Sequence, residues 1–435
     1  MTSSLADLHA SRLLAPTTTK RQVQVLHLIE SLGAGGAERL LHTNLRHLDS
    51  SRFRSTVMTV FSEPAHWVES INHLGVTVES LGCQSLRDLP AGITRLSRWL
   101  RVQHPDLMHT HLWAANVIGR VAGRMAGVPV ISSVHNPDHE PEAWDDGSEV
   151  SLRKRRLVRD LDRWTARFGC ERMVAVSEYV RRSAHRRLRF PLERIELIYN
   201  PIDADAFQSS AGPKRGELLG EYGIDEGDLM LLNVGRVTPQ KGLLYALRAL
   251  PLIRRRHPSV RLVSVGDAAD GLWLARLETE ARKLGVADRV HFLGARKDVG
   301  AFLRSCDLFI FPSLYEGLGI ALIEAMASGR ACVATRIGPI PEVLRHGVDG
   351  WLVEPASVES LAEGICDLLA DPLRRETLGR AAQASALARF QPQPAAAKLA
   401  ALYQSVVAAD RRNSLHRGGT SMPASVDRET LAEKR

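Results

Sequence analysis

The sequence predicts an α/β protein made of two doubly wound, Rossmann-like domains that face a central cleft. Three observations lead to this prediction. Short runs of β-branched residues alternate with stretches of helical apolar spacing, the pattern restarts after a linker-like stretch at residues 208–216, and the chain has 435 residues. Such alternation is typical of a mainly parallel sheet covered by helices. Two halves of about 200 residues fit the length better than one sheet of about a dozen strands.

The first half contains a series of strand-like runs. They are residues 23–29, 56–61, 76–81, 107–111, 128–134, 173–176 and 195–199. The first run is followed by a helical stripe that includes Leu40, Leu41 and Leu45. Residues 1–20 are predicted to be a flexible N-terminus, and residues 21–207 to form the N-terminal domain.

The second half repeats this arrangement. Its strand-like runs are residues 229–234, 260–265, 290–293, 308–311 and 331–334, and helices are predicted near residues 243–253, 272–284 and 320–327. Residues 208–390 form the predicted C-terminal domain. A last helix within residues 391–409 is predicted to cross back to the N-terminal domain, and the polar, aperiodic residues 410–435 to form a disordered tail.

The composition excludes several classes of protein. Hydrophobic residues make up 44% and charged residues 24% of the chain, which are the proportions of a globular protein rather than of a disordered one. No apolar run approaches the ~18 residues of a membrane span, and the first twenty residues lack the features of a secretory signal. The five cysteines are scattered singly, which favours reduced thiols and a cytoplasmic protein over a disulfide or zinc framework.

Positive charge is concentrated in one segment. Between Arg153 and Arg194 the sequence has fourteen Lys and Arg against five Asp and Glu, and the cluster begins with Arg153, Lys154, Arg155 and Arg156. An anionic partner and a merely solvated Arg-rich helix face explain this segment about equally well. Among anionic partners a membrane surface is favoured over nucleic acid, because aromatic residues make up only 5% of the chain.

The turn after the first predicted strand is rich in glycine. Gly35 and Gly36 open the next helix, where a bare backbone can approach a ligand and the helix N-terminus favours an anion. The dinucleotide fingerprint would need a small residue where Glu38 stands, so nicotinamide binding is disfavoured. A tight turn and a ligand-binding loop both fit this stretch.

Polar side chains gather where other predicted strands end. Ligands of doubly wound sheets bind at these carboxyl ends, so the histidines there, His109, His111 and His135, together with Trp113 and Asn136, are candidates for a cleft wall. A packed or capping role is the usual one for a single histidine. Three histidines at the carboxyl ends of consecutive strands favour a ligand-binding site.

The second half supplies charged candidates at the same edge. Arg236 and Lys241 bracket a strand-to-helix turn and could clamp a diphosphate, although surface exposure is the usual fate of such cations. The most specific feature is the stretch from Glu316 to Glu324, with Gly317, Leu318, Gly319 and Ile320 between a strand and a helix. Free N–H groups at that helix start suit a phosphate, and a carboxylate suits the hydroxyls of a ribose.

These motifs resemble those of the retaining glycosyltransferases of family 4, which have the GT-B fold. The matching segments are Glu316 to Glu324 as an E-x7-E motif, Gly235-Arg236 with Lys241, Gly35-Gly36-Ala37-Glu38, Val176-Ser177-Glu178, Asn200-Pro201-Ile202-Asp203 and Gly347-Val348-Asp349-Gly350-Trp351-Leu352-Val353. They run in the family's order and cover about residues 21–390. Pro201 and Pro339 stand where the family often has glycine, which affects the shape of those two loops.

The resemblance implies an acceptor-side N-terminal domain and a donor-side C-terminal domain. It implies that Arg236 and Lys241 hold the donor diphosphate, that Glu324 holds the ribose, and that Glu316 and His135 lie at the transferred sugar. Further expected positions are the phosphate-closing loop at Gly35 and Gly36, the donor loop at Gly317, Leu318, Gly319 and Ile320, and the acceptor-side wall at His111, Trp113 and Asn136. Arg236 and Lys241 supply the positive charge, so no metal and no cofactor are expected. The Asp-x-Asp pairs at Asp160 and Asp203 are not interpreted as metal sites.

The predicted activity is retaining transfer of a sugar from a UDP- or GDP-sugar to a glycan or lipid-linked acceptor in bacterial exopolysaccharide, capsule or glycolipid biosynthesis. The expected location is the cytoplasm, peripheral on the inner face of the plasma membrane, with no nucleic-acid partner. Two alternatives stay open at this point: a nucleotide-sugar epimerase of the same fold, and a catalytically silent nucleotide- or glycan-binding partner of a polysaccharide assembly.

Overall fold

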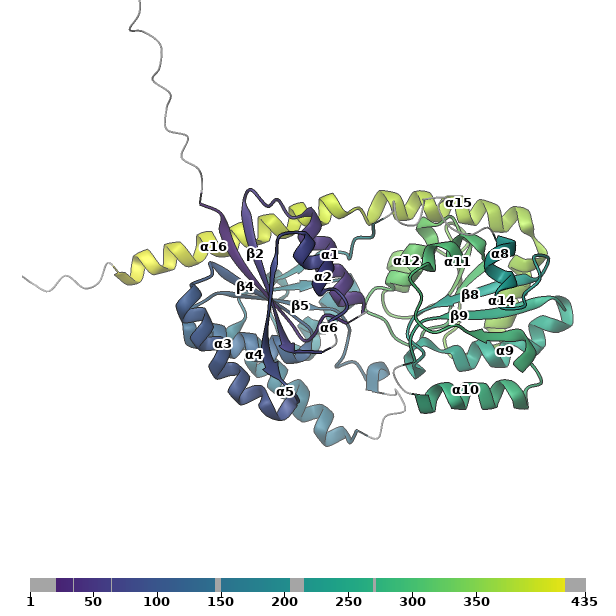
Figure 1. Cartoon of the computed structure of the whole chain (residues 1–435), viewed down its shortest axis with the longest axis horizontal. Coiled ribbons are helices and arrows are strands. Elements are labelled where there is room, and N and C mark those ends of the chain that lie inside the picture. The colour runs from purple at the N-terminus through teal and green to yellow at the C-terminus, as the bar shows by residue number, and fades with distance from the viewer. Residues whose placement is uncertain are drawn as a thin grey trace, which may run out of the picture.

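The computed structural model describes residues 21–33, 35–63, 65–144, 150–203, 215–268 and 271–418. These residues form two α/β domains side by side, joined along one edge by two long C-terminal helices (Figure 1). Each domain has one parallel sheet, as the sequence predicts. The predicted flexible N-terminus, the linker at residues 208–214 and the tail beyond residue 418 lie outside the described residues.

The N-terminal sheet has seven strands in the order β3-β2-β1-β4-β5-β6-β7, all paired in parallel. The strands are β1 (Val23–Ile29), β2 (Phe53–Phe61), β3 (Thr77–Cys83), β4 (Leu107–His111), β5 (Val130–Val134), β6 (Arg172–Ala175) and β7 (Ile195–Leu197). The helices of this domain are α1 (Gly36–His47), α2 (Val68–His73), α3 (Leu89–Gln103), α4 (Trp113–Ala126), α5 (Leu152–Gly169) and α6 (Glu178–Leu188).

The C-terminal sheet has six parallel strands in the order β10-β9-β8-β11-β12-β13. The strands are β8 (Leu229–Val234), β9 (Val260–Val265), β10 (Val290–Phe292), β11 (Leu308–Phe311), β12 (Cys332–Thr335) and β13 (Trp351–Val353). Its helices are α8 (Arg215–Gly220), α9 (Leu243–Arg256), α10 (Gly271–Lys283), α11 (Val299–Ser305), α12 (Ile320–Ala327), α13 (Ile340–Val343), α14 (Val358–Ala370) and α15 (Pro372–Arg389). The sequence prediction did not include strand β13, which forms the end of the Gly347–Val353 motif.

The last helix, α16 (Pro392–Gly418), leaves the C-terminal domain and packs on the N-terminal sheet. Leu399, Tyr403 and Val406 of α16 share a core with β1, β4 and β5, and this burial of apolar surface fixes the helix there. The helix ends at Gly418 and not near residue 409, so the tail predicted from residue 410 was placed too early. Residues 410–418 contain no proline, and Arg411 forms an ion pair with Asp106 at 3.0 Å, so nothing stops the helix at residue 409.

The two domains also meet at the cleft. The Glu342 carboxylate of α13 accepts hydrogen bonds from the backbone N–H groups of Glu178 and Tyr179, at 2.8 and 2.7 Å. A carboxylate from one domain therefore caps helix α6 of the other, where the helix dipole favours negative charge. Pro339 directly precedes α13 and so helps to place this carboxylate.

Candidate active site

The C-terminal side of the cleft is built at the ends of β8 and β11. The Lys241 ammonium lies 2.5 Å from Oε1 of Glu316, and the Ser313 hydroxyl donates to the same oxygen at 2.8 Å. Glu316 is 6% exposed. The structure thus brings a cation and a carboxylate that are 75 residues apart in sequence into one charge-assisted cluster at the sheet edge.

Two glycines make this edge possible. Gly242 has φ +64° and a Cβ there would lie 1.9 Å from the carbonyl oxygen of Pro312, while Gly319 has φ +93° at the start of α12. Any other residue would be strained at both positions. Residues 312–319 connect β11 to α12. The first N–H groups of α12 have no intrahelical partners.

Glu324 lies one turn into α12 and is 2% exposed. Its carboxylate pairs with the Arg39 guanidinium of α1, which reaches across from the other domain. Burial raises the pKa of Glu324, and the Arg39 charge opposes that rise. A buried carboxylate whose partner is a partly exposed arginine is suited to accept hydrogen bonds from ligand hydroxyls.

The glycine-rich turn of the N-terminal domain faces α12. A Cβ on Gly36 would lie 3.2 Å from Cδ1 of Ile320, and a Cβ on Gly35 would lie 2.3 Å from a carboxylate oxygen of Glu38. Glu38 is buried, which raises its pKa, although the positive charge of the exposed Arg236 opposes the rise. The predicted phosphate-closing loop and Arg236 are therefore on facing sides of the same gap.

His135 and Asn136 form the opposite wall of the cleft. A Cβ on Gly317 would lie 1.7 Å from the His135 carbonyl oxygen and 3.1 Å from Oδ1 of Asn136, so the donor loop is in contact with this wall. The Ser177 hydroxyl donates to the Gly317 carbonyl at 2.6 Å. Burial lowers the pKa of His135 to about 4, which makes the ring neutral near pH 7.

A small cavity of about 30 Å³ adjoins His135 in the N-terminal domain. Trp113, Asn136 and Asp162 are among the residues that line it. The predicted acceptor-side residues Trp113 and Asn136 therefore come together beside His135.

His111, in contrast, was wrongly predicted to be a wall residue. It is fully buried, and its Nδ1 lies 3.4 Å from Nε2 of His135, so it packs behind that ring. Side chains alternate along a strand, and the even spacing puts His109 and His111 on the covered face of β4. His111 therefore contacts the His135 ring and does not line the cleft.

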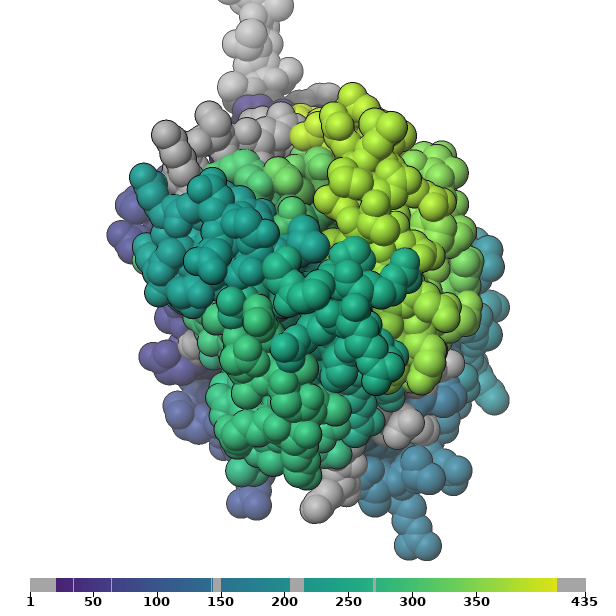
Figure 2. Space-filling model, turned by 90° about the vertical axis from the view of Figure 1, so that its right-hand side faces the viewer, coloured from purple at the N-terminus to yellow at the C-terminus, as the bar shows by residue number. Residues whose placement is uncertain are grey.

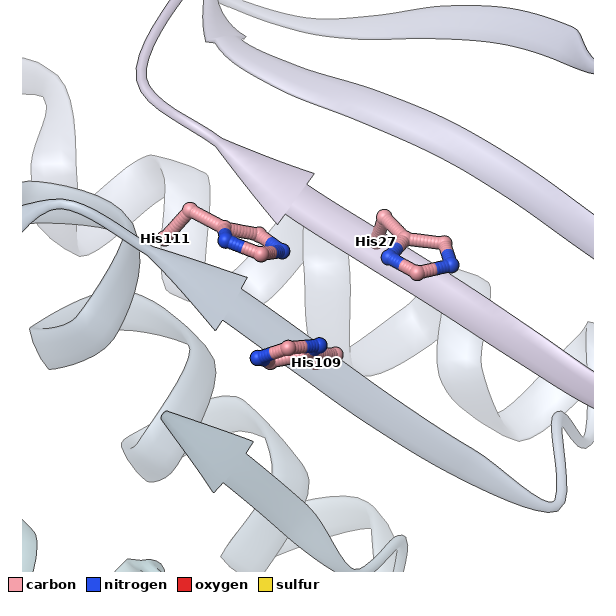
Figure 3. Close-up of side chains that lie close together, drawn as sticks. All are labelled: His27, His109 and His111. Atoms are coloured by element: carbon pink, nitrogen blue, oxygen red, sulfur yellow. The ribbon is translucent and has the colours of Figure 1, made fainter. Parts of the chain in front are cut away.

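A cluster of three buried histidines, His27 of β1 with His109 and His111 of β4, lies under this wall (Figure 3). His27 pairs with His109 in the sheet register. Burial lowers the pKa of His27 to about 3 and those of His109 and His111 well below their ordinary value, so all three are neutral. Both ring nitrogens of His109 have partners, Nδ1 the Tyr403 hydroxyl at 2.6 Å and Nε2 the Ser133 hydroxyl at 2.9 Å.

A metal bound by all three histidines would have to displace a partner of His109, whereas Nδ1 of His27 and Nε2 of His111 have no hydrogen-bond partner in the part of the chain that the structure describes. The three described aspartates of the Asp-x-Asp pairs form ion pairs with arginine side chains. Asp162 binds Arg120 at 2.5 Å, Asp160 binds Arg159 at 3.0 Å, and Asp203 binds Arg46 at 2.6 Å. The absence of a metal and of a cofactor stays a prediction.

Three interactions could not be found from the sequence. They are the Arg39–Glu324 pair, the Glu342 cap on α6 and the Tyr403–His109 hydrogen bond, which join residues 285, 164 and 294 positions apart. The only local signal was for Arg39, which directly follows Gly35-Gly36-Ala37-Glu38.

Comparison with known proteins agrees with this geometry. Residues 34–206 match the family model described as Glycosyltransferase Family 4, and residues 214–385 match the model described as Glycosyl transferases group 1. This chain belongs to glycosyltransferase family 4. The first match lies in the N-terminal domain and the second in the C-terminal domain.

Relatives of this family 4 glycosyltransferase cover most of its length. The chain is 28% identical over 316 residues to N-acetyl-alpha-D-glucosaminyl L-malate synthase of Bacillus anthracis, covering 71% of this chain and 77% of that protein. It is 24% identical over 358 residues to the UDP-Gal:alpha-D-GlcNAc-diphosphoundecaprenol alpha-1,3-galactosyltransferase of Escherichia coli, covering 80% and 88%.

Solved structures show the same GT-B fold. The crystal structure of Anabaena HepE in complex with UDP-glucose has a TM-score of 0.78 and 24% sequence identity, over 88% of this chain and all of that one. A sucrose-phosphate synthase from Thermosynechococcus elongatus has a TM-score of 0.75 and 21% identity, over 89% and 100%. The predicted fold class and the predicted glycosyltransferase activity are confirmed.

Proposed function

We propose that the protein transfers a sugar, with retention of its anomeric configuration, from a UDP- or GDP-sugar to a glycan or lipid-linked acceptor. The observation that supports this most directly is the cluster of Lys241, Glu316 and Ser313 at the edge of the C-terminal sheet, with Glu324 one turn further on and His135 facing it. This is a charged donor side opposite a neutral wall.

In this proposal Lys241 and Arg236 hold the donor diphosphate. Negative charge grows on the diphosphate as its bond to the sugar breaks, and fixed cations and the N–H groups at the start of α12 stabilise that charge without reorganisation. Glu324 accepts hydrogen bonds from the ribose hydroxyls, and Arg39 gives up part of its contact with Glu324 when the donor enters. Gly35 and Gly36 let the α1 turn approach the phosphates.

The sugar is transferred at Glu316 and His135. Glu316 accepts hydrogen bonds from the sugar hydroxyls, and the neutral His135 ring and its carbonyl bound the other side. The departing phosphate oxygen takes the proton of the acceptor hydroxyl on the face that it leaves. The new bond therefore forms on that same face, which gives retention.

One named relative supports the acceptor proposal, because its name gives a sugar linked to diphosphoundecaprenol as the acceptor. The other named relative makes an L-malate glycoside, which is neither a glycan nor lipid-linked. The predicted acceptor-side residues Trp113 and Asn136 lie beside His135, where they line a cavity of about 30 Å³. We assign the protein to bacterial exopolysaccharide, capsule or glycolipid assembly, in the cytoplasm at the inner face of the plasma membrane. In the described part of the chain no helix is long and apolar enough to cross a bilayer.

A donor screen tests this proposal. The purified chain is incubated with UDP-, GDP- and ADP-sugars, release of the nucleotide diphosphate is followed, and NMR gives the anomeric configuration of the first-formed product. Release from a UDP- or GDP-sugar with the donor's configuration, lost in His135→Ala while UDP or GDP still shifts the unfolding midpoint, is the expected result. A changed nucleotide sugar would show an epimerase, and nucleotide binding without turnover of any donor would show a silent partner.

A further inference from the structure

A second cavity lies in the N-terminal domain, away from the cleft. It has a volume of about 390 Å³ and lies between the first residues of β1, β2 and β3 and the last turns of α3. Cavities that hold small ligands have volumes of about 300–1,000 Å³. The lining is mainly polar, and the polar side chains that matter most are Gln24, Arg54, Thr77, Glu79, Trp99 and Gln103. This cavity is called the α3 pocket below.

The floor of the α3 pocket departs from the usual composition of a parallel sheet. Strands of such sheets are covered on both faces and are nearly continuous in apolar residues. Further along the same strands, Leu28, Met58 and Leu81 follow this rule and belong to one hydrophobic core. Toward the amino ends the same sheet face carries polar side chains instead, namely Gln24, Arg54, Thr56, Thr77 and Glu79. Gln24 and Arg54 are partners in the register of β1 and β2, so the polar patch crosses from strand to strand.

Trp99 of α3 forms a wall of the pocket. It packs against the core under α3 and also lines the pocket. Its indole N–H donates to Oε2 of Glu79 on β3, at 2.9 Å. Gln103 comes four residues later, on the same side of the helix, and lines the pocket too. The Trp99 ring is therefore held from both sides, by α3 and by β3, in one orientation beside the polar floor.

Several polar groups of the pocket are available to a ligand. Arg54, Thr77 and Gln103 are exposed, and their side chains form no hydrogen bond or ion pair within the residues that the structure describes. The Glu79 carboxylate is exposed as well and accepts the bond from Trp99. Hydrogen-bond donors and acceptors thus surround one aromatic ring.

The charges of the pocket favour a neutral ligand over a phosphate. Arg54 and Glu79 carry opposite charges, and α3 ends beside them at Gln103, where the helix dipole disfavours anions. Sugar hydroxyls both donate and accept hydrogen bonds, so they match a guanidinium, a carboxylate and amides. The C–H groups of a sugar ring carry partial positive charge and pack on the negative face of an aromatic ring.

We propose that the α3 pocket binds a sugar unit of a glycan chain, with the sugar ring on Trp99 and its hydroxyls on Arg54 and Glu79. The pocket is separate from the acceptor side of the cleft at His135 and Asn136. It would hold a glycan whether or not a donor is bound.

The pocket and the cleft lie at opposite ends of the N-terminal strands. Gln24 of β1 lines the pocket, whereas Glu30 directly follows β1 and accepts a hydrogen bond from the N–H of Ala114 in α4, at 2.7 Å. The six residues of extended strand between them span ~20 Å. In Figure 1 α3 lies on the side of the N-terminal domain that is turned away from the C-terminal domain. In Figure 2 the C-terminal domain, in teal, green and yellow, lies in front of the N-terminal domain, in purple and blue.

Only a glycan of several sugar units can reach from the α3 pocket to the cleft. Such a chain is held at two points, which raises the effective concentration of its reacting end. This step rests on the proposed function, because it makes the bound glycan the acceptor. Glycan binding by the pocket can be measured without any transfer of sugar.

Oligosaccharide binding to the full chain tests the proposal. Maltohexaose, cellohexaose and chitohexaose are titrated calorimetrically without a donor. We expect at least one of them to bind, with an affinity that saturating UDP or GDP leaves unchanged. Trp99→Ala should lower that affinity at least about tenfold, and Arg54→Ala about threefold or more. The matched controls Trp164→Ala on α5 and Arg98→Ala on α3 remove exposed side chains that do not line the pocket and should bind as the wild type does.

Several results would overturn the proposal. One is that none of the three hexasaccharides binds, and another is that a heparin hexasaccharide binds more tightly than any neutral one. A third is unchanged affinity in Trp99→Ala; if that variant does not fold, unchanged affinity in Arg54→Ala decides in its place. A fourth is binding that Asn136→Ala abolishes and Trp99→Ala keeps, which would place the glycan in the cleft.

The failure of this proposal can be told apart from a failure of the proposed function. Nucleotide release from a donor sugar without an acceptor needs no glycan, so it reports on the proposed function alone. That release should be the same in Arg54→Ala as in the wild type, because the pocket lies ~20 Å from the cleft.

Discussion

The two sides of the cleft differ in charge: one is built around ion pairs and the other around neutral histidines. The C-terminal side holds the ion pair of Lys241 with Glu316 and the carboxylate of Glu324, whose partner Arg39 reaches across from the N-terminal domain. On the N-terminal side, the wall at the ends of β4 and β5 holds His135, with His27, His109 and His111 packed behind it, and burial keeps these imidazoles neutral. Permanent charge is needed where a diphosphate leaves, whereas neutral polar groups suit a wall that contacts sugar hydroxyls. The difference implies that substitutions on the two sides should change different properties: catalysis and donor binding on the C-terminal side, and stability on the N-terminal side.

The largest effect is expected at Lys241. Lys241→Ala should lower kcat by about 100- to 1000-fold and change the KM for the donor much less, because the charge on the diphosphate is greatest in the transition state. Steady-state kinetics with the donor found in the screen measure this, with exposed Lys283→Ala as the control. An unchanged kcat would remove Lys241 from leaving-group stabilisation and break the contrast between the two sides.

Glu324 should affect binding more than turnover. Glu324→Gln should weaken nucleotide diphosphate binding by about tenfold or more, since hydrogen bonds to a charged group contribute about 1.5–3 kcal/mol. Calorimetric titration with UDP or GDP measures the Kd. Arg39→Gln is the comparison and should weaken binding less, because the Arg39 side chain is 41% exposed and belongs to the other domain. An equal or larger loss in Arg39→Gln would assign the site to the Arg39–Glu324 pair as a unit.

The buried histidines of the N-terminal domain should make the folding stability sensitive to acid. The pKa of His27 in the folded protein, about 3, lies below its unfolded value of about 6.5. Its contribution to stability is therefore fully present above pH 6.5 and is lost as the pH falls from 6.5 toward 3. At pH 5 this loss is about 2 kcal/mol.

Urea unfolding at pH 7.5 and pH 5 measures that loss. His27→Gln should show a smaller decrease between the two pH values than the wild type, and exposed His66→Gln should show the same decrease as the wild type. If His27→Gln kept the full acid sensitivity, the titrating groups would have to lie elsewhere.

The smallest effect on activity is expected at Tyr403. Tyr403→Phe leaves the buried Nδ1 of His109 without its partner and should cost about 1–3 kcal/mol of folding free energy. Donor kcat and KM should stay close to the wild type, because the hydroxyl is on the covered face of the sheet. Chemical unfolding gives the stability change, with Tyr245→Phe on α9 as the control. A large fall in kcat at unchanged stability would show that α16 adjusts the cleft through His109.

The sequence predicts most of the donor side and less of the acceptor side. Lys241, Glu316 and Glu324 follow strands whose apolar runs are easy to recognise, and glycines mark the turns between them. The acceptor side was harder, because the same local pattern fits both a wall residue and a buried one. His111 ends one strand-like run and His135 follows the next, yet His111 is fully buried and His135 faces the cleft.

What the sequence determined by itself was local: the alternation of strands and helices, the break between two domains, and the donor motifs. These depend on spacing along the chain, through the periods of strands and helices and the conformational freedom of glycine. Only the tertiary structure decided which charges meet across the cleft, that Tyr403 holds His109, and which side of α5 faces outward. Those outcomes depend on how separately formed surfaces pack: burying Asp162 against Arg120 on one side of α5 leaves Leu157, Leu161, Trp164 and Phe168 exposed on the other.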